Sequence, residues 1–341
     1  MVREREARLA LIKDVPAQNF REGLLTVNLP PRFDPKISGK VRDIWAFDDR
    51  LAIVSTDRNS AYDSVICTVP DSGVIINEIS NWWKKRIAHL MDTDYLSSPN
   101  QNTNLTIVKK AAVRFDVEFV FRRFLEKSAS RTSLYHKYRI EGRRNIYGID
   151  FPDDLIDNQE LPMGAIFTPT TKAADGQHDM EITEEEAREK VDTQANKRGT
   201  FDRIKPNLVM LFGMGTDVHK ARGLYLPSTK YEVGLDKDGT PMVIDEIHTP
   251  HSSRIWIAGT YQERFEKGRN PESLDKEILR VILNDAGYTG DGPIPKLKLN
   301  DIRSLVEAYA RVYFMITRER PPRRYSAEEI TGTIVRYFQD N

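Results

Sequence analysis

The chain of 341 residues carries 51 lysine and arginine side chains and 51 aspartate and glutamate side chains, so its formal net charge is zero. This balance provides no basic field for nucleic acid, and no apolar run approaches the roughly 20 residues that span a membrane. A single cysteine, Cys67, excludes internal disulfides, and we expect a soluble cytoplasmic protein of about two domains.

The N-terminal part reads as one helix followed by short strands. Residues 3–13 are rich in helix formers, and we expect strands over residues 24–27, 40–47 and 51–55. Gly39 lies in the turn before the second of these strands. Such a turn can cover phosphate groups with Lys40 reaching in, although a glycine in a surface turn more often serves the turn alone.

A polar segment, residues 55–63, follows the third strand. Asp57 and Ser60 can cap a helix there, and a binding role is nearly as well supported because the cluster lies at the end of an apolar strand. Residues 77–91 show the apolar spacing of an amphipathic helix. Two further strands, residues 105–112 and 117–125, are expected to pair with each other.

The middle of the chain is first polar and then helical. Residues 126–165 are basic and rich in turn formers. Thr183 and Glu186 have the spacing of a capping box, which predicts a helix from there to about residue 198. A second helix is expected over residues 207–222.

A β-hairpin is predicted around the turn at residues 236–239, which ends in Asp-Gly. Alternation along its first strand places Lys230 and Glu232 on one face and Tyr231 on the other. A four-residue loop sets Lys230 opposite Asp245, and a two-residue loop sets Glu232 opposite Asp245. Both registers place one lysine and two carboxylates on the same face of the hairpin.

These three charges form either a ligand site or a solvated salt-bridge cluster. Carboxylates suit Mg²⁺ and a lysine suits phosphate, so the set matches a nucleotide with its metal. Cross-strand ion pairs on an exposed sheet would give the same pattern. The polar loop at residues 248–254 favours a site, because loops at strand ends often carry binding residues.

The C-terminal part is expected to be mainly helical. One helix begins at Ser273 and runs to about residue 286, a glycine- and proline-rich loop follows, and a further helix covers residues 300–316. The chain contains neither G-x-x-x-x-G-K-[ST] nor G-x-G-x-x-G, so two common nucleotide-binding folds have no motif support.

Seven stretches together resemble the SAICAR synthetase family of purine-pathway ligases. In chain order they are residues 38–43, 56–63, 117–122, 168–173 with His178 and Asp179, 229–232, 244–250 with 252–254, and 275–277. The resemblance implies an α+β or α/β fold. An N-terminal antiparallel sheet, like the small lobe of a protein kinase, would cover ATP over residues 1–125. A larger ATP-grasp-like α/β domain with C-terminal helices would hold the substrates and Mg-ATP over residues 126–341.

The resemblance also implies an ATP-dependent ligase that uses ATP and Mg²⁺. Such an enzyme joins the carboxylate of carboxyaminoimidazole ribotide (CAIR) to the amine of L-aspartate through an acyl phosphate, releasing ADP and phosphate. This chemistry needs in-line placement and neutralised charge more than covalent help from the protein. The implied partners are small molecules, with neither nucleic acid nor membrane, and the chain is compatible with a homo-oligomer.

Site residues follow from the same resemblance. The implied catalytic residues are Lys230, Lys172 and Asp245, and the implied Mg²⁺ ligands are Glu232 and Asp245. ATP would be bound by Gly39, Lys40, Arg42 and Glu232. The residues implied at the substrates are Arg122, Arg254, Ser128, Ser133, Ser253, Asp63, His178 and Asp275. The two arginines suit a phosphate or carboxylate because guanidinium is a planar, two-pronged donor.

Two positions depart from the family pattern. Ser228 and His251 stand where the family usually has acids. The change is either a neutral substitution compensated by nearby residues, or the mark of a paralogue that accepts another heteroaromatic acid or another amine. A small-molecule kinase is an alternative of another class, but the H-R-D and D-F-G kinase motifs are absent. A non-catalytic nucleotide-binding module would require loss of the metal ligands, and Glu232 and Asp245 are both present.

Overall fold

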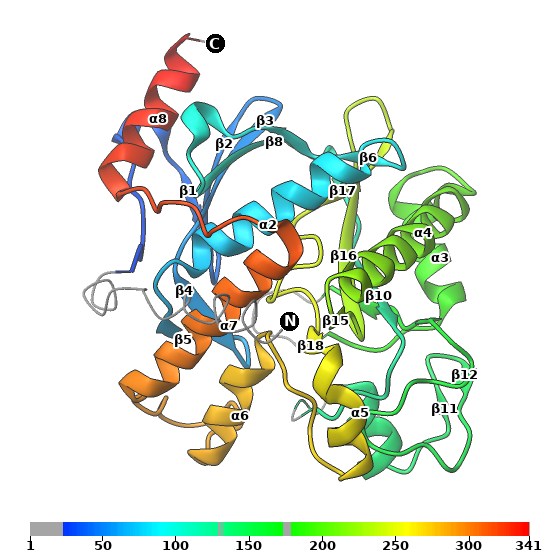
Figure 1. Ribbon diagram of the computed structural model, residues 1–341. Helices are drawn as coiled ribbons and strands as arrows, with labels where there is room; N and C mark the ends of the chain where they lie inside the picture. The colour runs from blue at the N-terminus through cyan, green and yellow to red at the C-terminus, as the bar shows by residue number, and fades with distance from the viewer. Residues whose placement is uncertain (1–22, 129, 131, 173–178, 341) are drawn as a thin grey trace.

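Two β-sheets form the framework of the protein (Figure 1). The structure is a computed structural model that describes residues 23–128, 130, 132–172 and 179–340. The helix expected over residues 3–13 and the candidate residue His178 lie outside the described residues.

The first sheet is antiparallel, with five strands in the order β1-β2-β3-β8-β7. They are β1 (Lys36–Ser38), β2 (Arg42–Phe47), β3 (Arg50–Ser55), β8 (Leu105–Lys109) and β7 (Tyr95–Ser97). The turn between β1 and β2 is closed by the N–H of Gly39, which donates to the carbonyl of Arg42 with an N to O distance of 2.8 Å. The candidate phosphate turn therefore lies at the end of the edge hairpin.

The second sheet has seven strands in the order β13-β10-β16-β17-β6, with β14 also paired to β10 and β9 to β16. They are β13 (Ile166–Phe167), β10 (Val117–Arg122), β16 (Ser228–Leu235), β17 (Pro241–Ile244), β6 (Asp92–Thr93), β14 (Thr170–Thr171) and β9 (Val113–Arg114). The β17–β6 pair is parallel and the others are antiparallel.

Helices pack beside both sheets (Figure 1). The α-helices are α2 (Ser72–Ile87), α3 (Glu184–Gln194), α4 (Thr200–Ala221), α5 (Ala258–Glu266), α6 (Glu277–Asp285), α7 (Leu299–Thr317) and α8 (Ala327–Asp340). Short elements are η2 (Pro31–Phe33), η3 (Pro99–Gln101), η4 (His136–Ile140), β4 (Arg58–Ala61) with β5 (Ser64–Thr68), β11 (Asn145–Ile146) with β12 (Ile149–Asp150), and β15 (Leu224–Tyr225) with β18 (Trp256–Ile257).

The larger apolar core lies between the second sheet and α4 and continues to α2, α6 and α7. Phe119 and Phe121 of β10 and Tyr231 of β16 are buried on one face of the sheet. The ring centroid of Phe119 lies 6.2 Å from that of Phe201, and the ring centroid of Phe121 lies 5.8 Å from that of Phe212. Because side chains alternate along a strand, the even-numbered residues of β10 and β16 point to the opposite face.

A second core joins the two ends of the chain. Trp45 and Val54 of the first sheet are fully buried against Ile330 and Ile334 of α8. Figure 1 shows α8, in red, lying beside the strands of this sheet. The C-terminal helix thus completes the N-terminal sheet.

The mixed α/β fold with an N-terminal antiparallel sheet and C-terminal helices is confirmed. The domain boundary at residue 125 stays a prediction, and three strands before it, β6, β9 and β10, belong to the second sheet. None of the helices within the described part of the chain is long and apolar enough to cross a membrane.

Two predicted strand arrangements are wrong. Residues 24–27 form no strand, because carboxylate side chains accept two of their backbone N–H groups in place of a neighbouring strand. The N–H of Leu24 donates to Asp57 at 2.7 Å, and the N–H of Val27 donates to Asp43 at 2.8 Å. The expected pairing of residues 105–112 with 117–125 is also wrong, since β8 and β10 lie in different sheets.

Helix prediction was more accurate. The capping box of Thr183 and Glu186 is confirmed, although α3 ends at Gln194, earlier than expected. Four other predicted helices correspond to α2, α4, α6 and α7, although α6 begins at Glu277, later than the expected Ser273. Helices α5 and α8 were not predicted.

Candidate functional site

Four charged side chains meet on the face of the second sheet opposite the aromatic core. The β10–β16 register sets Val120 opposite Lys230, and its continuation brings Glu118 level with Glu232. The Nζ of Lys230 lies 2.5 Å from Oε1 of Glu118, and the Nζ of Lys172 donates to Oε2 of Glu232. We call Glu118, Lys172, Lys230 and Glu232 the four-charge face.

Mutual attraction keeps the central pair of this face ionised. Burial opposes charge on Glu232, but Lys172 and Lys230 outweigh it and hold the pKa of that carboxyl below its ordinary value. Burial also opposes charge on Lys230, yet Glu118 and Glu232 raise the pKa of its ammonium. Two cations and two carboxylates therefore balance before any ligand binds.

Neither predicted pairing of the hairpin strands is observed, so neither places Asp245 on this face. Each of the two predicted registers differs from the observed one by one residue. Glu232 lies opposite Ile244, because the loop comprises residues 236–240. A carboxylate oxygen of Asp236 holds this longer loop by accepting from the N–H groups of Asp238 at 2.9 Å and Thr240 at 2.8 Å.

The backbone at Asp245 redirects its side chain. Regular alternation from the observed register would turn Asp245 toward the core with Tyr231. Instead β17 ends at Ile244, and Asp245 takes the left-handed conformation with φ of 65°. Its carboxylate is 28% exposed and pairs with Arg42.

Arg42 ties the first sheet to the start of the loop after β17. Its guanidinium binds Asp245 with one nitrogen and Glu246 with the other. Burial opposes charge on Glu246, but Arg42 lowers the pKa of that carboxyl. A small cavity of about 20 Å³ is lined by Arg42 and Asp245 together with residues of β3, β8 and α2. The predicted nucleotide residue Arg42 and the predicted metal residue Asp245 are therefore in direct contact.

The donor set suits Mg²⁺ chemically. Within the described ranges, no group of three or more histidine, cysteine, aspartate or glutamate side chains is placed to hold a metal ion. Mg²⁺ is usually bound through one or two carboxylates together with substrate phosphates and water, so Glu232 and Asp245 are donors of the right kind. Lys172 is paired with Glu232 and Arg42 with Asp245, so both ion pairs would have to break before these carboxylates could bind Mg²⁺. The metal assignment stays a prediction.

The candidate phosphate turn brings two predicted residues together. The Nζ of Lys40 lies 2.5 Å from Oδ1 of Asp63, and the two side chains are 42% and 54% exposed. Asp57, from the same polar segment as Asp63, is fully buried, and its carboxylate accepts the N–H of Gly73 at 2.9 Å near the start of α2. Residues 58–61 form strand β4, so the helix expected there with Asp57 or Ser60 as its cap is wrong. Asp57 instead binds the first turn of α2, whose N-cap residue is Asp71.

Arg122 and the two candidate serines lie around the end of β10. Arg122 donates to Glu126 at 2.8 Å and to Oγ1 of Thr168 at 3.1 Å. Ser133 accepts the N–H of His136, the first residue of η4, at 3.1 Å, while Ser128 accepts the N–H of Ser130 at 3.3 Å. These serines are engaged by their own turn.

Arg254 is held by a buried carboxylate. It lies 3.5 Å from Asp275 and 2.9 Å from Glu277. Asp275 is fully buried and accepts the backbone N–H groups of Ile255 at 2.7 Å and Glu277 at 2.8 Å. Burial raises the pKa of Asp275, although Arg254 opposes this shift. The hydroxyl of the predicted Ser253 is buried 2.8 Å from that of Thr229 on β16.

Three charged residues of this region were given no role in the sequence prediction. Glu118 was detectable as the single charge within the apolar run 117–121, and Glu246 as the neighbour of Asp245. Lys276 donates to the hydroxyl of Ser60 at 3.2 Å. Burial, reinforced by the nearby Arg280, lowers the pKa of Lys276 to about 7. Its position beside Ser60 depends on tertiary contacts, which no local pattern reports.

The two positions that depart from the family pattern, Ser228 and His251, lie among the residues of the candidate site. Ser228 is buried opposite Arg122. The Nε2 of His251 lies 3.1 Å from Oδ1 of Asn59, and its ring packs against Tyr309. Burial lowers the pKa of His251 to about 4, although Glu246 opposes this shift, so the imidazole is neutral at pH 7.

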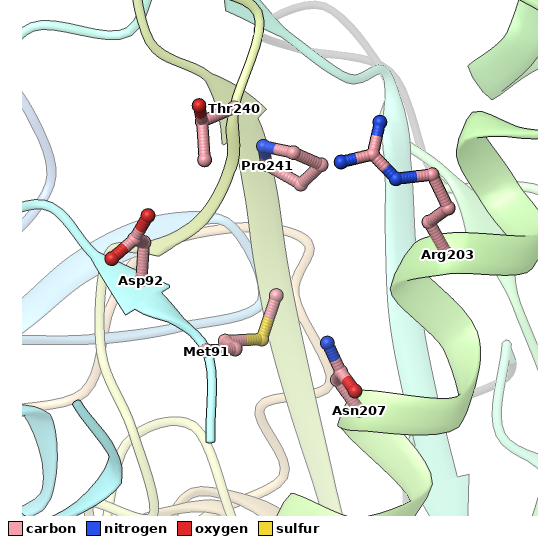
Figure 2. Close-up of a pocket in the computed structure, with 6 residues that line it drawn as sticks. All are labelled: Met91, Asp92, Arg203, Asn207, Thr240 and Pro241. Carbon is pink, nitrogen blue, oxygen red and sulfur yellow. The ribbon is translucent and has the colours of Figure 1, made fainter. Parts of the chain in front are cut away.

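A larger cavity of about 210 Å³ lies elsewhere, at the turn end of the hairpin (Figure 2). Figure 2 shows Arg203 and Asn207 projecting from α4 toward Pro241 and Thr240, with Met91 and Asp92 on the other side. None of the predicted site residues lines it. The candidate site is therefore the charged region around β10, β16 and the loop after β17.

Comparisons with known proteins point to one family. The SAICAR synthetase family model matches residues 36–294. A phosphoribosylaminoimidazole-succinocarboxamide synthase of Arabidopsis thaliana, named as chloroplastic, is 40% identical over 313 residues, covering 92% of this chain and 73% of that protein. The synthase of that name from Legionella pneumophila (strain Lens) is 39% identical over 298 residues, covering 87% and 91%.

Solved structures agree with this result. The SAICAR synthase of Saccharomyces cerevisiae, in a complex with SAICAR, superposes with a TM-score of 0.72 and 25% identity, covering 87% of this chain and 99% of that one. The family match covers most of the chain and includes both sheets of the framework. This chain belongs to the SAICAR synthetase family.

Proposed function

We propose that this protein is the ATP-dependent carboxylate-amine ligase that joins CAIR to L-aspartate, giving SAICAR, ADP and phosphate. The observation that carries the proposal is the four-charge face, where two lysines lie paired with carboxylates on adjacent strands. The names of the relatives at 39–40% identity support the same activity.

In the first step, an oxygen of the ribotide carboxylate attacks the γ-phosphorus of ATP. The bond from that phosphorus to the ADP oxygen breaks, and an acyl phosphate forms. Lys172 and Lys230 neutralise the phosphoryl group as it transfers, since each can exchange its carboxylate partner for a phosphate oxygen. Lys40 and Arg42, on the β1–β2 hairpin, hold the nucleotide phosphates.

In the second step, the amine nitrogen of L-aspartate attacks the acyl carbon. The bond from that carbon to the phosphate oxygen breaks, phosphate leaves, and the nitrogen loses a proton as the amide forms. Arg122 and Arg254 grip the anionic groups of the substrates, and buried Asp275 fixes the direction of Arg254. The roles assigned to Ser128, Ser133, Ser253 and Asp63 stay predictions.

Glu232 and Asp245 would hold Mg²⁺, which when bound neutralises triphosphate charge during the transfer. Their release from Lys172 and Arg42 would accompany nucleotide binding. A homo-oligomeric state and a cytoplasmic location stay predictions, and two plant relatives are named as chloroplastic.

The test is a complete reaction with ATP, Mg²⁺, L-aspartate and CAIR, in which ADP release and product mass are followed together. We expect SAICAR to form only when both co-substrates are present. The variant Lys230→Met should lose this turnover, whereas Lys205→Met, which removes a lysine of α4 that pairs with Glu184 of α3, should keep it. ADP release with a phosphorylated acceptor and no amide would instead indicate a kinase. Turnover only with another acid would indicate the paralogue.

A further inference from the structure

A buried imidazole anchors the loop that carries Glu246 and Arg254. His248 lies four residues beyond the end of β17 and is fully buried. Its backbone has φ of 51°, a left-handed conformation that non-glycine residues rarely adopt. Such a conformation persists only when the surroundings fix it. The side-chain contacts of His248 therefore have to account for its position.

Three aromatic side chains surround the ring of His248. The centroid of Trp83 from α2 lies 4.4 Å away with the ring planes at 88°, and those of Tyr231 and His219 lie 5.4 Å and 5.9 Å away. The hydroxyl of Tyr231 is hydrogen-bonded to Nε2 of His248. Tyr231 lies between Lys230 and Glu232 on β16, so this bond joins the strand of the four-charge face to the loop.

A glycine of α4 makes room for the ring. A Cβ atom at Gly215 would lie 2.3 Å from Cε1 of His248, which is far inside van der Waals contact. Gly213 on the same helix has open space at the corresponding position. The carbonyl of Gly215 also accepts a hydrogen bond from Nδ1 of His219 at 2.7 Å. The ring of His248 therefore requires glycine at position 215. At position 213 no neighbouring atom would contact a larger side chain's Cβ.

The cluster is uncharged. Burial, with a smaller contribution from His219, lowers the pKa of His248 well below its ordinary value. Burial also lowers the pKa of His219 to about 4. Both imidazoles are neutral at pH 7, so the ring of His248 acts through its shape and its hydrogen bond and not through its charge.

The loop connects the ring of His248 to charged residues on both sides of it in the sequence. Glu246, two residues before His248, binds Arg42 and accepts from the hydroxyl of Thr249. Further along, the N–H of Arg254 donates to the carbonyl of Ser228 at 2.9 Å and so returns the loop to β16. The two ends of the segment 246–254 are held by these contacts, and His248 holds its interior.

We propose that His248 is a positioning residue of the ligase, whose ring, seated by Gly215 and Tyr231, fixes the loop that places Glu246 with Arg42 and directs Arg254. This inference rests on the ligase activity proposed above. It predicts that changes at two buried, uncharged residues on different elements, Gly215 and Tyr231, impair the same reaction.

The test measures kcat and KM for CAIR and ATP in three variants, together with their unfolding midpoints. Gly215→Ala displaces the ring, Tyr231→Phe removes only the hydroxyl, and Gly213→Ala is the matched control on the same helix. We expect Gly215→Ala and Tyr231→Phe to lower kcat about tenfold because misplacing groups by small distances slows positioned reactions. Gly213→Ala should match the parent protein.

Two further variants separate positioning from general damage. In a His248→Ala background, Gly215→Ala should cause no further loss of kcat, because the ring that it displaces is gone. His248→Asn should retain more activity than His248→Ala, since asparagine tolerates the left-handed conformation and keeps an acceptor for Tyr231.

The inference is overturned if Tyr231→Phe folds with the parent midpoint and also keeps the parent kcat and KM. Additive losses in the double variant would equally overturn it. If Gly215→Ala does not fold, Tyr231→Phe decides, because it removes a single oxygen. Turnover by the parent protein in the same assay establishes the ligase reaction first, so a null result for the variants bears on His248 alone.

Discussion

Glu118→Gln is the sharpest test of the four-charge face, because it removes one charge and leaves the shape of the side chain. Glu118 is 10% exposed and its partner Lys230 is 37% exposed, with an N to O distance of 2.5 Å. A hydrogen bond between charged groups contributes about 1.5–3 kcal/mol, and solvent access to Lys230 favours the lower end. A loss of about 1.4 kcal/mol corresponds to about tenfold in rate.

The variant also changes the charge balance. Without Glu118, both Lys172 and Lys230 compete for Glu232, which is the carboxylate assigned to Mg²⁺. We therefore expect kcat to fall about tenfold and the Mg²⁺ concentration for half-maximal rate to rise. Both are measured from ADP release at saturating CAIR, ATP and L-aspartate while Mg²⁺ is varied.

A matched control exists on the surface. Glu184 pairs with Lys205 at the same distance, 2.5 Å, but its side chain is 40% exposed on α3. Glu184→Gln should leave kcat and the Mg²⁺ dependence unchanged, since exposed ion pairs contribute little. Parent-like kinetics for Glu118→Gln, or equal losses in the two variants, would refute the view that Glu118 sets Lys230 for the reaction.

Three further predictions follow from the site and the core. Asp245→Asn should abolish Mg²⁺-dependent turnover and leave the fold intact, and near-normal activity would remove Asp245 from the metal site. Arg42→Gln should raise the KM for ATP and lower the Mg²⁺ requirement, because Asp245 and Glu246 lose a competing cation; a rise in both would indicate a purely structural role. His219, whose pKa burial lowers to about 4, should make the protein less stable in acid. Below its unfolded pKa of about 6.5 the unfolded chain binds a proton that the folded chain does not, so about 1.4 kcal/mol of unfolding free energy is lost by pH 5.5. Urea unfolding at pH 7.5 and 5.5 should show this loss reduced in His219→Gln relative to His89→Gln, a change at the exposed surface, and equal losses would contradict it.

Alternation along β16 was predictable from the sequence, because a sheet with one apolar face imposes a period of two. Tyr231 and Val233 are buried in the aromatic core, while Lys230 and Glu232 lie on the charged face. The same reasoning applied to β10 identifies Glu118 between Val117 and Phe119. Residues within regular strands could therefore be placed before the structure was known.

Asp245 could not be placed in this way, because it lies one residue beyond the strand. The register depended on a loop held by the side chain of Asp236, and the direction of Asp245 depended on a positive φ at a non-glycine residue. Neither feature has a sequence pattern as strong as the Asp-Gly turn that suggested a shorter loop. The resemblance to the correct family was recognised even so, because the order and spacing of the motifs along the chain do not depend on how the strands of the hairpin pair.

These two failures and the His248 anchor have a common physical origin. Asp245 and His248 are both non-glycine residues with positive φ, at 65° and 51°, and they lie three residues apart in the segment that leaves β17. Such conformations are unfavourable for the chain alone and require compensating contacts. Arg42 supplies them for Asp245, and Tyr231 with the space at Gly215 supplies them for His248. The loop is therefore shaped by residues distant in sequence, on β2, α4 and β16. A substitution at any of these three elements should alter the charged site even when the substituted residue touches no ligand.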